Sequence, residues 1–258
     1  MIYIILPSFN EEKNLIKIIK KIEFLNKKLK SKVILVDDGS NDATGKIVKK
    51  KYSIKIIYLK HKTNKGLSLT LESGFKKVVK IGGKKDIVIT LDADLQDDPK
   101  EIPNLVNEIQ KGYDMVSGWK KNRKDPISKT APSKIFNLVL RYFSGIQIHD
   151  FNCGLKAYKN RVVKSLNLYG GLHRFIPVLV KQNGFSITEL VVNHRERKYG
   201  ITKYGTSRIF HGLYDFITIL FLKKYFNRPL HFFGKYGIIL ASIGVSINIF
   251  LSYNWFLN

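Results

Sequence analysis

The chain has 258 residues, of which 44% are hydrophobic and 12% aromatic. This length and composition exclude a disordered chain and allow one substantial α/β core with a modest appendage. Lysine and arginine number 45 against 20 aspartate and glutamate, and the formal net charge of +25 implies an anionic partner such as nucleic acid, lipid head groups or a phosphorylated substrate. Cys153 is the only cysteine, which excludes an intramolecular disulfide and a multi-cysteine zinc site and favours a reducing compartment.

Up to about Val192, short apolar runs alternate with longer segments of helical period, which is typical of a mostly parallel sheet with helices on its faces. The N-terminal run is broken by Pro7 and lacks a basic leader, so it is interpreted as the first core strand rather than a signal peptide. Strands are predicted at residues 2–6, 33–36, 55–59, 86–91, 114–117, 154–158 and 186–192. Helices are predicted at residues 11–29, 43–51, 67–80, 100–111, 133–143 and 172–183, several of them preceded by an Asn, Asp or Ser that can cap a helix.

Two of the predicted strands end in carboxylates. An apolar run at residues 87–91 is followed by Asp92 and Asp94, and a second run at 33–36 is followed by Asp37 and Asp38. Carboxylates at i and i+2 can converge on one hard divalent cation, and strand ends of open α/β sheets are where ligands usually bind. Asp92 and Asp94 are the strongest candidates for chemistry, whereas an Asp-Asp-Gly turn by itself is structural more often than functional.

Three other polar segments lie at strand ends or helix starts. Residues 7–12 follow the first strand and open a helix, and residues 64–66 precede the third helix with a lysine and a glycine. Each has a plain interpretation as the start of a helix. Asp97 or Asp98 is predicted to cap the next helix, with Pro99 at its first position.

Taken together, the segments at residues 7–11, 37–40, 64–66 and 92–96 resemble the successive motifs of glycosyltransferase family 2 enzymes of the GT-A fold. Further along, the segments at 97–99, 150–156, 173–177 and 197–205 resemble the polyprenyl-phosphate branch of that family, which includes the dolichyl-phosphate mannosyltransferases. The resemblance extends to about Lys235. It implies a metal-dependent enzyme that transfers a sugar from a UDP- or GDP-sugar to a polyprenyl phosphate.

The resemblance also implies roles for single residues. Pro7, Asn10, Glu11 and Asp38, together with Asp37, Lys65 and Ala93, would line the nucleotide-sugar pocket. Asp92 and Asp94 would hold Mg²⁺ or Mn²⁺ on the donor diphosphate, with Gln96 close to the metal. Arg197 and Lys203 would contact phosphates, and Arg174, Arg195 and Arg197 are candidate clamps for the lipid phosphate because a guanidinium grips phosphate through two donors.

Two features depart from the family pattern. An arginine often found just after the strand at 114–118 is replaced by Trp119-Lys120-Lys121, and the carboxy-terminal membrane region is shorter than usual. The first departure affects the donor contacts, and the second leaves lipid handling and homo-oligomerisation open. A phosphate acceptor is already anionic at neutral pH, so in-line attack that inverts the anomeric centre would require no general base.

The carboxy-terminal part is predicted to attach the enzyme to a membrane. We divide the chain into a GT-A catalytic domain at 1–205, an amphipathic interfacial helix and juxtamembrane segment at 206–230, and a transmembrane segment at 231–258. Residues 236–253 contain no charge, which meets the lower length for a transmembrane helix. Four cations within residues 223–235 precede this stretch and none follows it, so the positive-inside rule leaves the catalytic domain in the cytoplasm.

Two other functions compete with this one. A basic module that docks on nucleic acid would use the net charge, but acidic strand ends would repel nucleic-acid phosphates. A family 2 enzyme with a saccharide or lipid-linked glycan hydroxyl acceptor would need a carboxylate base, for which Asp97 and Asp150 are candidates. A processive polysaccharide synthase is disfavoured because the chain lacks a Gln-x-x-Arg-Trp motif. The sugar, the nucleotide, the lipid chain and the preferred metal are left open.

Overall fold

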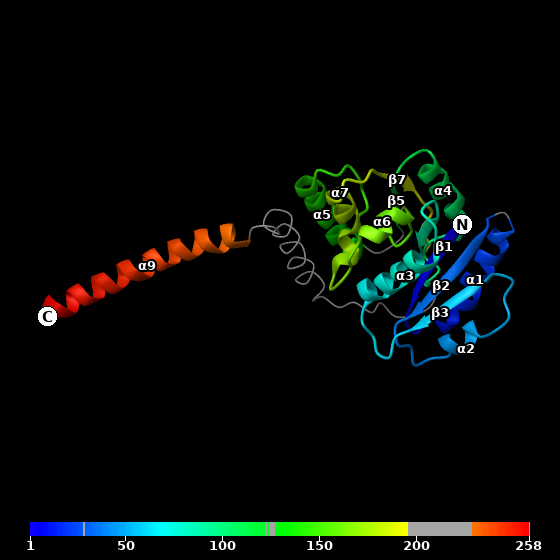
Figure 1. Cartoon of the computed structure of the whole chain (residues 1–258), viewed down its shortest axis with the longest axis horizontal. Coiled ribbons are helices and arrows are strands. Elements are labelled where there is room, and N and C mark those ends of the chain that lie inside the picture. The colour runs from blue at the N-terminus through cyan, green and yellow to red at the C-terminus, as the bar shows by residue number, and fades with distance from the viewer. Residues whose placement is uncertain (28, 122, 124–126, 196–228, 258) are drawn as a thin grey trace. The chain divides into compact units, whose positions relative to one another are not determined.

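A computed structural model describes residues 1–27, 29–121, 123, 127–195 and 229–257. The chain divides into two compact units, Met1–Ile209 and Phe210–Asn258. The first unit contains a sheet with helices packed on it, and the second contains one long helix (Figure 1). Most of the amphipathic segment predicted at 206–230 lies outside the described residues.

The first unit is built on a seven-stranded sheet with the order β3-β2-β1-β4-β6-β5-β7. β6 is antiparallel to both of its neighbours, β4 and β5, and all other pairs are parallel. All seven predicted strands are present, with ends that differ by a few residues. Their bounds are β1 Ile2–Ser8, β2 Ser31–Asp37, β3 Ile56–Lys60, β4 Ile87–Thr90, β5 Met115–Trp119, β6 Lys156–Lys159 and β7 Ile187–Val191.

The six predicted helices are also present, and one helix was missed. The missed helix, α6 (Asn160–Ser165), has only six residues, too few to show a helical period. The others are α1 Glu12–Asn26, α2 Thr44–Val48, α3 Leu67–Ile81, α4 Ile102–Gln110, α5 Ile127–Ser144 and α7 Ile176–Gln182. Short 3₁₀ turns, η1 Pro99–Glu101 and η2 Leu172–Phe175, lead into α4 and α7.

The central strand β1 is buried along its whole length because both faces of the sheet are covered. Ile4 and Leu6 belong to a core cluster that includes residues of α1 and α4. Ile5 points the other way, toward α3, where a Cβ on Gly74 would lie 2.7 Å from the Ile5 side chain. Glycine at position 74 therefore allows α3 to approach the sheet closely, and α3 in turn forms one boundary of the cavity described below.

The first two helices cap each other through contacts distant in sequence. The Glu12 carboxylate accepts a hydrogen bond from Ala43 N at 2.9 Å, and the Asp42 carboxylate accepts one from Glu12 N at 3.1 Å. Local side-chain capping of α1 and α2, which the sequence favoured, is absent at both helices. At η1 the predicted cap is present, because Asp98 accepts from Lys100 N at 3.3 Å.

The second unit contains α9 (Pro229–Leu257), and within it Phe233–Phe256 is long and apolar enough to cross a membrane. Polar side chains inside this stretch bond to the helix itself. The hydroxyls of Ser242 and Ser246 and the amide of Asn248 each donate to the carbonyl four residues earlier, at 2.9–3.0 Å. The apolar helix predicted here is present, and its polar residues are compatible with a lipid environment.

Candidate functional site

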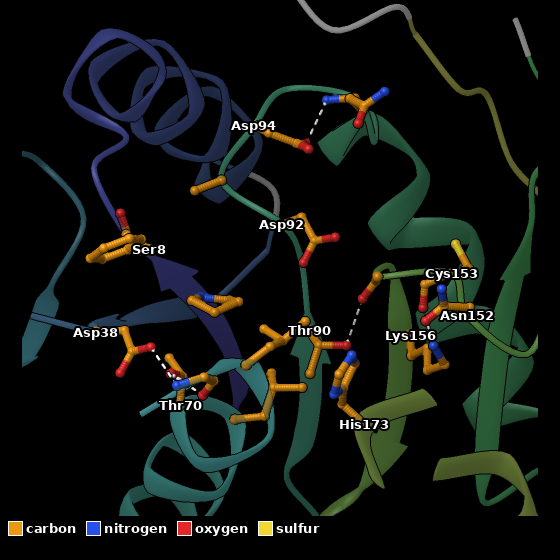
Figure 2. A pocket seen from close by; sticks show the side chains of 18 of the residues that line it. Ser8, Asp38, Thr70, Thr90, Asp92, Asp94, Asn152, Cys153, Lys156 and His173 are labelled. Atoms are coloured by element: carbon orange, nitrogen blue, oxygen red, sulfur yellow. Dashed lines mark hydrogen bonds between the residues drawn. The ribbon is translucent and has the colours of Figure 1, made fainter. Parts of the chain in front are cut away.

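A cavity of about 660 Å³ opens at the carboxyl ends of the parallel strands β1, β2 and β4. Figure 2 shows Asp38 on one side of it, Asp92 and Asp94 above, and Asn152, Cys153 and Lys156 on the opposite side. Seven of the predicted site residues line this cavity: Pro7, Glu11, Asp38, Asp92, Ala93, Asp94 and Gln96. Segments separated by more than one hundred residues in the sequence thus meet at one place.

Asp92 and Asp94 follow β4 and both line the cavity. Burial, and then the negative charges of Asp94 and Asp97, raise the pKa of Asp92 to about 7. Asp94 accepts a hydrogen bond from Gln96 N at 3.1 Å, and Leu95 between them adopts a φ of 66°. A leucine rarely adopts this left-handed conformation, so the local turn holds strain at the point where the two carboxylates are presented.

A glycine on the neighbouring segment makes room for Asp92. A Cβ at Gly154 would lie 2.6 Å from Asp92 Cγ, too close for any other residue without displacement of the carboxylate. Gly154 O also accepts a hydrogen bond from Thr90 Oγ1 at 2.8 Å, which fixes residues before β6 beside the end of β4. The antiparallel insertion of β6 between β4 and β5 is what brings this glycine to the site.

Part of the first acidic strand end is used by the fold. Asp37 is fully buried, accepts from Ser40 N at 2.8 Å and from Tyr58 Oη at 2.6 Å, and does not line the cavity. Asn10 also stays outside the lining and joins two loops, because its N donates to Ser40 Oγ and its Oδ1 accepts from Asn41 N. These two residues are positioned to hold the cavity wall in shape.

Asp38 lines the cavity and lies at the centre of a hydrogen-bonded array. Its carboxylate accepts from Lys65 N and Gly66 N, both at 2.9 Å, and from His61 Nδ1 at 2.7 Å. His61 Nε2 lies 2.9 Å from Ser73 Oγ on α3. The loop before α3 is thereby attached to Asp38 through the backbone of Lys65, while the Lys65 side chain is exposed and outside the lining.

Three cationic side chains form a wall opposite Asp38. Lys120 and Arg123 follow β5, Lys156 begins β6, and all three line the cavity. Lys156 is 3% exposed and donates from Nζ to Cys153 O, and burial lowers its pKa. We call Lys120, Arg123 and Lys156 the cationic wall. The sequence contained a signal for it, since Lys156 ends the segment at 150–156 and Lys120 stands where relatives often have arginine, but neither residue was assigned a role.

The remaining predicted phosphate contacts lie elsewhere or outside the described residues. Arg174 is buried in η2 and does not line the cavity, although its neighbour His173 does. Arg195 forms an ion pair with Asp98 and lines a separate cavity of about 340 Å³ beside α1. Arg197 and Lys203 lie outside the described residues.

The residues present fit a divalent cation that is shared with a phosphorylated ligand. No group of three or more His, Cys, Asp or Glu side chains that could hold a metal is found within the described ranges. Two carboxylates, with phosphate oxygens from the ligand, are the donor set that Mg²⁺ commonly accepts. The space that Gly154 leaves beside Asp92 and the repulsion that raises the pKa of Asp92 both suit a cation at this position.

Comparison with known proteins agrees with this geometry. The family model described as "Glycosyl transferase family 2" matches residues 3–166. A dodecaprenyl-phosphate galacturonate synthase of Rhizobium johnstonii is 33% identical and covers 98% of this chain and 76% of its own length. An undecaprenyl-phosphate 4-deoxy-4-formamido-L-arabinose transferase of Pseudomonas fluorescens is 33% identical, over 94% of this chain and 70% of its own.

The fold is also similar to that of solved structures. Glucosyl-3-phosphoglycerate synthase of Mycobacterium tuberculosis, crystallised with Mn²⁺, UDP and phosphoglyceric acid, has a TM-score of 0.64 to this chain at 18% identity. The similarity covers 86% of this chain and 78% of the other. The predicted GT-A type of α/β fold is confirmed.

Proposed function

The chain belongs to glycosyl transferase family 2, and on that premise we propose that it transfers a sugar from a nucleoside-diphosphate sugar to the phosphate of a polyprenyl phosphate. The observation that carries the proposal is a single cavity in which Asp92 and Asp94 face the cationic wall. Such a cavity can bind a metal-bound diphosphate and a second phosphate together. The relatives at 33% identity, named as polyprenyl-phosphate sugar transferases, support this acceptor.

The donor nucleotide binds on the side of β1 and β2. Pro7, Glu11 and Asp38 line that side, and Ser8 Oγ is buried there without a hydrogen-bond partner among the described residues. An unsatisfied buried hydroxyl is costly unless a ligand or water meets it. Asn10, Asp37 and the backbone of Lys65 act indirectly in this proposal, by holding the loops that contact the nucleotide.

In the chemical step, an oxygen of the acceptor phosphate attacks the anomeric carbon and forms a new C–O bond. The bond from the anomeric carbon to the donor diphosphate breaks, and the nucleoside diphosphate leaves with the electron pair. Attack from the face opposite the leaving group inverts the configuration. The cationic wall offers fixed positive charge for the phosphates, which lowers the barrier as negative charge moves onto the leaving group.

A bound Mg²⁺ or Mn²⁺ would neutralise charge on the departing diphosphate. Asp92 and Asp94 are the side chains that would hold it, with Gln96 at the same end of the cavity. Gln96 also connects the site to the segment before residue 196, because Arg195 N donates to Gln96 O at 2.8 Å. Through this contact, Arg197 and Lys203 are proposed to reach the phosphates.

A hydroxyl acceptor would need a carboxylate base, and the two candidates make other contacts. Asp97 is buried, lies 3.6 Å from His194 Nδ1 and does not line the cavity. Asp150 is buried, accepts from Asn152 N at 3.1 Å and is also outside the lining. A phosphate acceptor needs no such base, which favours the lipid phosphate over a saccharide.

We place the catalytic unit on the cytoplasmic face of a membrane, with α9 as the span. Lys223, Lys224, Arg228 and Lys235 lie just before or at the start of the apolar stretch, and the positive-inside rule assigns that side to the cytoplasm. A polyprenyl acceptor cannot leave the bilayer, so an enzyme that uses it must work at the membrane surface.

The test is transfer of radiolabelled sugar into the organic phase. Detergent-purified protein is incubated with Mg²⁺ or Mn²⁺, undecaprenyl phosphate and a panel of UDP- and GDP-sugars. We expect transfer from one donor and its loss in Asp94→Asn. Glu108→Gln is the matched control, because Glu108 pairs with Lys111 on α4, away from the cavity, at 2.7 Å. Transfer only to a saccharide, or equal transfer by Asp94→Asn, would contradict the proposal.

A further inference from the structure

The outer face of α5 is apolar and exposed. Ile135, Leu138 and Tyr142 lie at i, i+3 and i+7, on one side of the helix, and are 63%, 64% and 82% exposed. The opposite side is also apolar, with Leu140 1% exposed and Phe136 packed edge-on against Phe175. A surface helix normally carries polar residues on its outer face, so this one is built to contact something apolar. We call Ile135, Leu138 and Tyr142 the α5 patch.

The α5 patch belongs to the helix that borders the cationic wall. Arg123, which lines the cavity, donates to Ser133 Oγ of α5 at 3.2 Å. Asn137 accepts from Phe151 N at 3.3 Å, and the next residue, Asn152, lines the cavity. The inner side of α5 thus fixes the wall at which a second phosphate would bind, while its outer side carries the patch.

The charges around the patch are all of one sign. Residues 126–149 contain no aspartate or glutamate, while Lys134 and Arg141 lie on the same helix. Arg141 donates from Nε to Ile148 O at 3.1 Å, and Lys134 is exposed. Apolar side chains with a tyrosine, bordered by cations, match the boundary between lipid tails and anionic head groups.

We propose that the α5 patch inserts into the interfacial region of an anionic lipid bilayer and turns the cationic wall toward the membrane. This inference rests on the proposed function, because a polyprenyl acceptor presents its phosphate at that depth. A second copy of the chain is the weaker occupant. Three side chains on two turns of one helix are a small patch beside the roughly 800 Å² that each partner of a stable dimer buries. A small patch suffices to orient a unit that a membrane helix already tethers.

The chain is suited to a direct test because its only cysteine, Cys153, is buried. Leu138→Cys is labelled with an environment-sensitive fluorophore in the full chain, reconstituted at one copy per nanodisc with phosphatidylglycerol-containing lipid. Phe24→Cys on α1 is the matched control, since Phe24 is also large, apolar and 67% exposed. Lipids with quenchers near the head group should reduce emission at position 138 at least about twofold more than at position 24, as expected for a helix buried 5–10 Å deep.

Equal quenching at both positions would overturn the proposal, and so would emission at position 138 that shifts to the blue without lipid quenching. The second result would mean that protein, either another copy or another part of this chain, covers the patch. Both outcomes are read without any sugar transfer, so they are separate from failure of the proposed function.

A second variant tests the consequence for the reaction. Leu138→Asp replaces an exposed side chain and should fold normally, but a carboxylate at this depth is unfavourable in lipid. We expect transfer to undecaprenyl phosphate in bilayers to fall about tenfold, as about 1.4 kcal/mol would give, with transfer to a detergent-dispersed acceptor unchanged. Equal loss in both settings, or no loss in either, would contradict a role in membrane contact.

Discussion

The two walls of the cavity are built in different ways. On the side of β1 and β2, Asp38 accepts three hydrogen bonds and Asn10 joins two loops, so the polar groups are paired within the protein. On the side of β5 and β6, Lys120 and Lys156 bring positive charge into a site with fewer fixed partners. The difference teaches that one wall is a preorganised surface for a nucleotide and the other holds charge for phosphates.

Asp92 stands between the two walls, so its replacement should have the largest effect. We expect Asp92→Asn to lower the rate of sugar transfer about 10²–10³-fold, the range seen when one group that stabilises transition-state charge is removed. The shape of the side chain is preserved, so the unfolding temperature in detergent should change little. A variant that keeps more than a tenth of the rate would show that the charge of Asp92 is not required.

Gly154 sharpens the comparison because it lies at the boundary with the cationic wall. Gly154→Ala should displace the Asp92 carboxylate, since the added Cβ would lie 2.6 Å from Asp92 Cγ. The rate should fall about 10–100-fold, as expected when a reacting group moves by about 1 Å. Gly83→Ala is the control, because a Cβ there meets only Asp86 atoms, at 3.7 Å or more. Similar rates for the two variants would mean that Asp92 tolerates movement.

His61 tests the preorganised wall through a residue that does not line the cavity. His61→Ala removes the Nδ1 donor from Asp38 and leaves the carboxylate with the two backbone donors. Loss of a hydrogen bond to a charged group costs about 1.5–3 kcal/mol, so the KM for the donor should rise about tenfold or more. The kcat should change little, and His61→Asn should restore part of the affinity because its amide nitrogen lies near the position of Nδ1. A fall in kcat alone would place His61 in the chemistry instead.

Asp114 lies at the opposite end of β5 and should affect stability without affecting either wall. Burial would raise its pKa, but hydrogen bonds from Arg161, Ser186 N and Lys159 hold it at about 2. A carboxylate whose pKa is lowered by folding stabilises the protein above its unfolded pKa, and this contribution is lost as pH falls from about 4 to 2. Asp114→Asn should therefore cost up to about 2 kcal/mol at pH 7 and flatten the acid side of the stability curve.

Thermal unfolding in detergent between pH 3 and 7, with sugar transfer measured in parallel, checks the Asp114→Asn prediction. An unchanged unfolding temperature at pH 7, or a loss of transfer without a loss of stability, would contradict it. Asp86→Asn offers a comparison, because Asp86 bonds to Gly83 N and the N-terminal amine at the same end of the sheet.

Local patterns sufficed for the elements and for the most acidic part of the site. Each strand has an apolar run bounded by turn residues, and Asp92 and Asp94 stand out because they follow one of these runs directly. The α6 helix was missed because six residues carry too little periodicity. Roles for Lys120 and Lys156 were missed for a different reason, since nothing in their local sequence shows that they share a cavity with Asp92.

The amino-acid sequence by itself determined the seven strands, the apolar carboxy-terminal helix and the acidic end of β4, because periodicity and composition act over a few residues. Only the tertiary structure decided that β6 enters antiparallel between β4 and β5 and places Gly154 and Lys156 beside Asp92. It also decided that Asp37 is used by the fold while Asp38 faces the cavity. Adjacent residues on a strand point to opposite faces, so their different roles follow from what packs on each face.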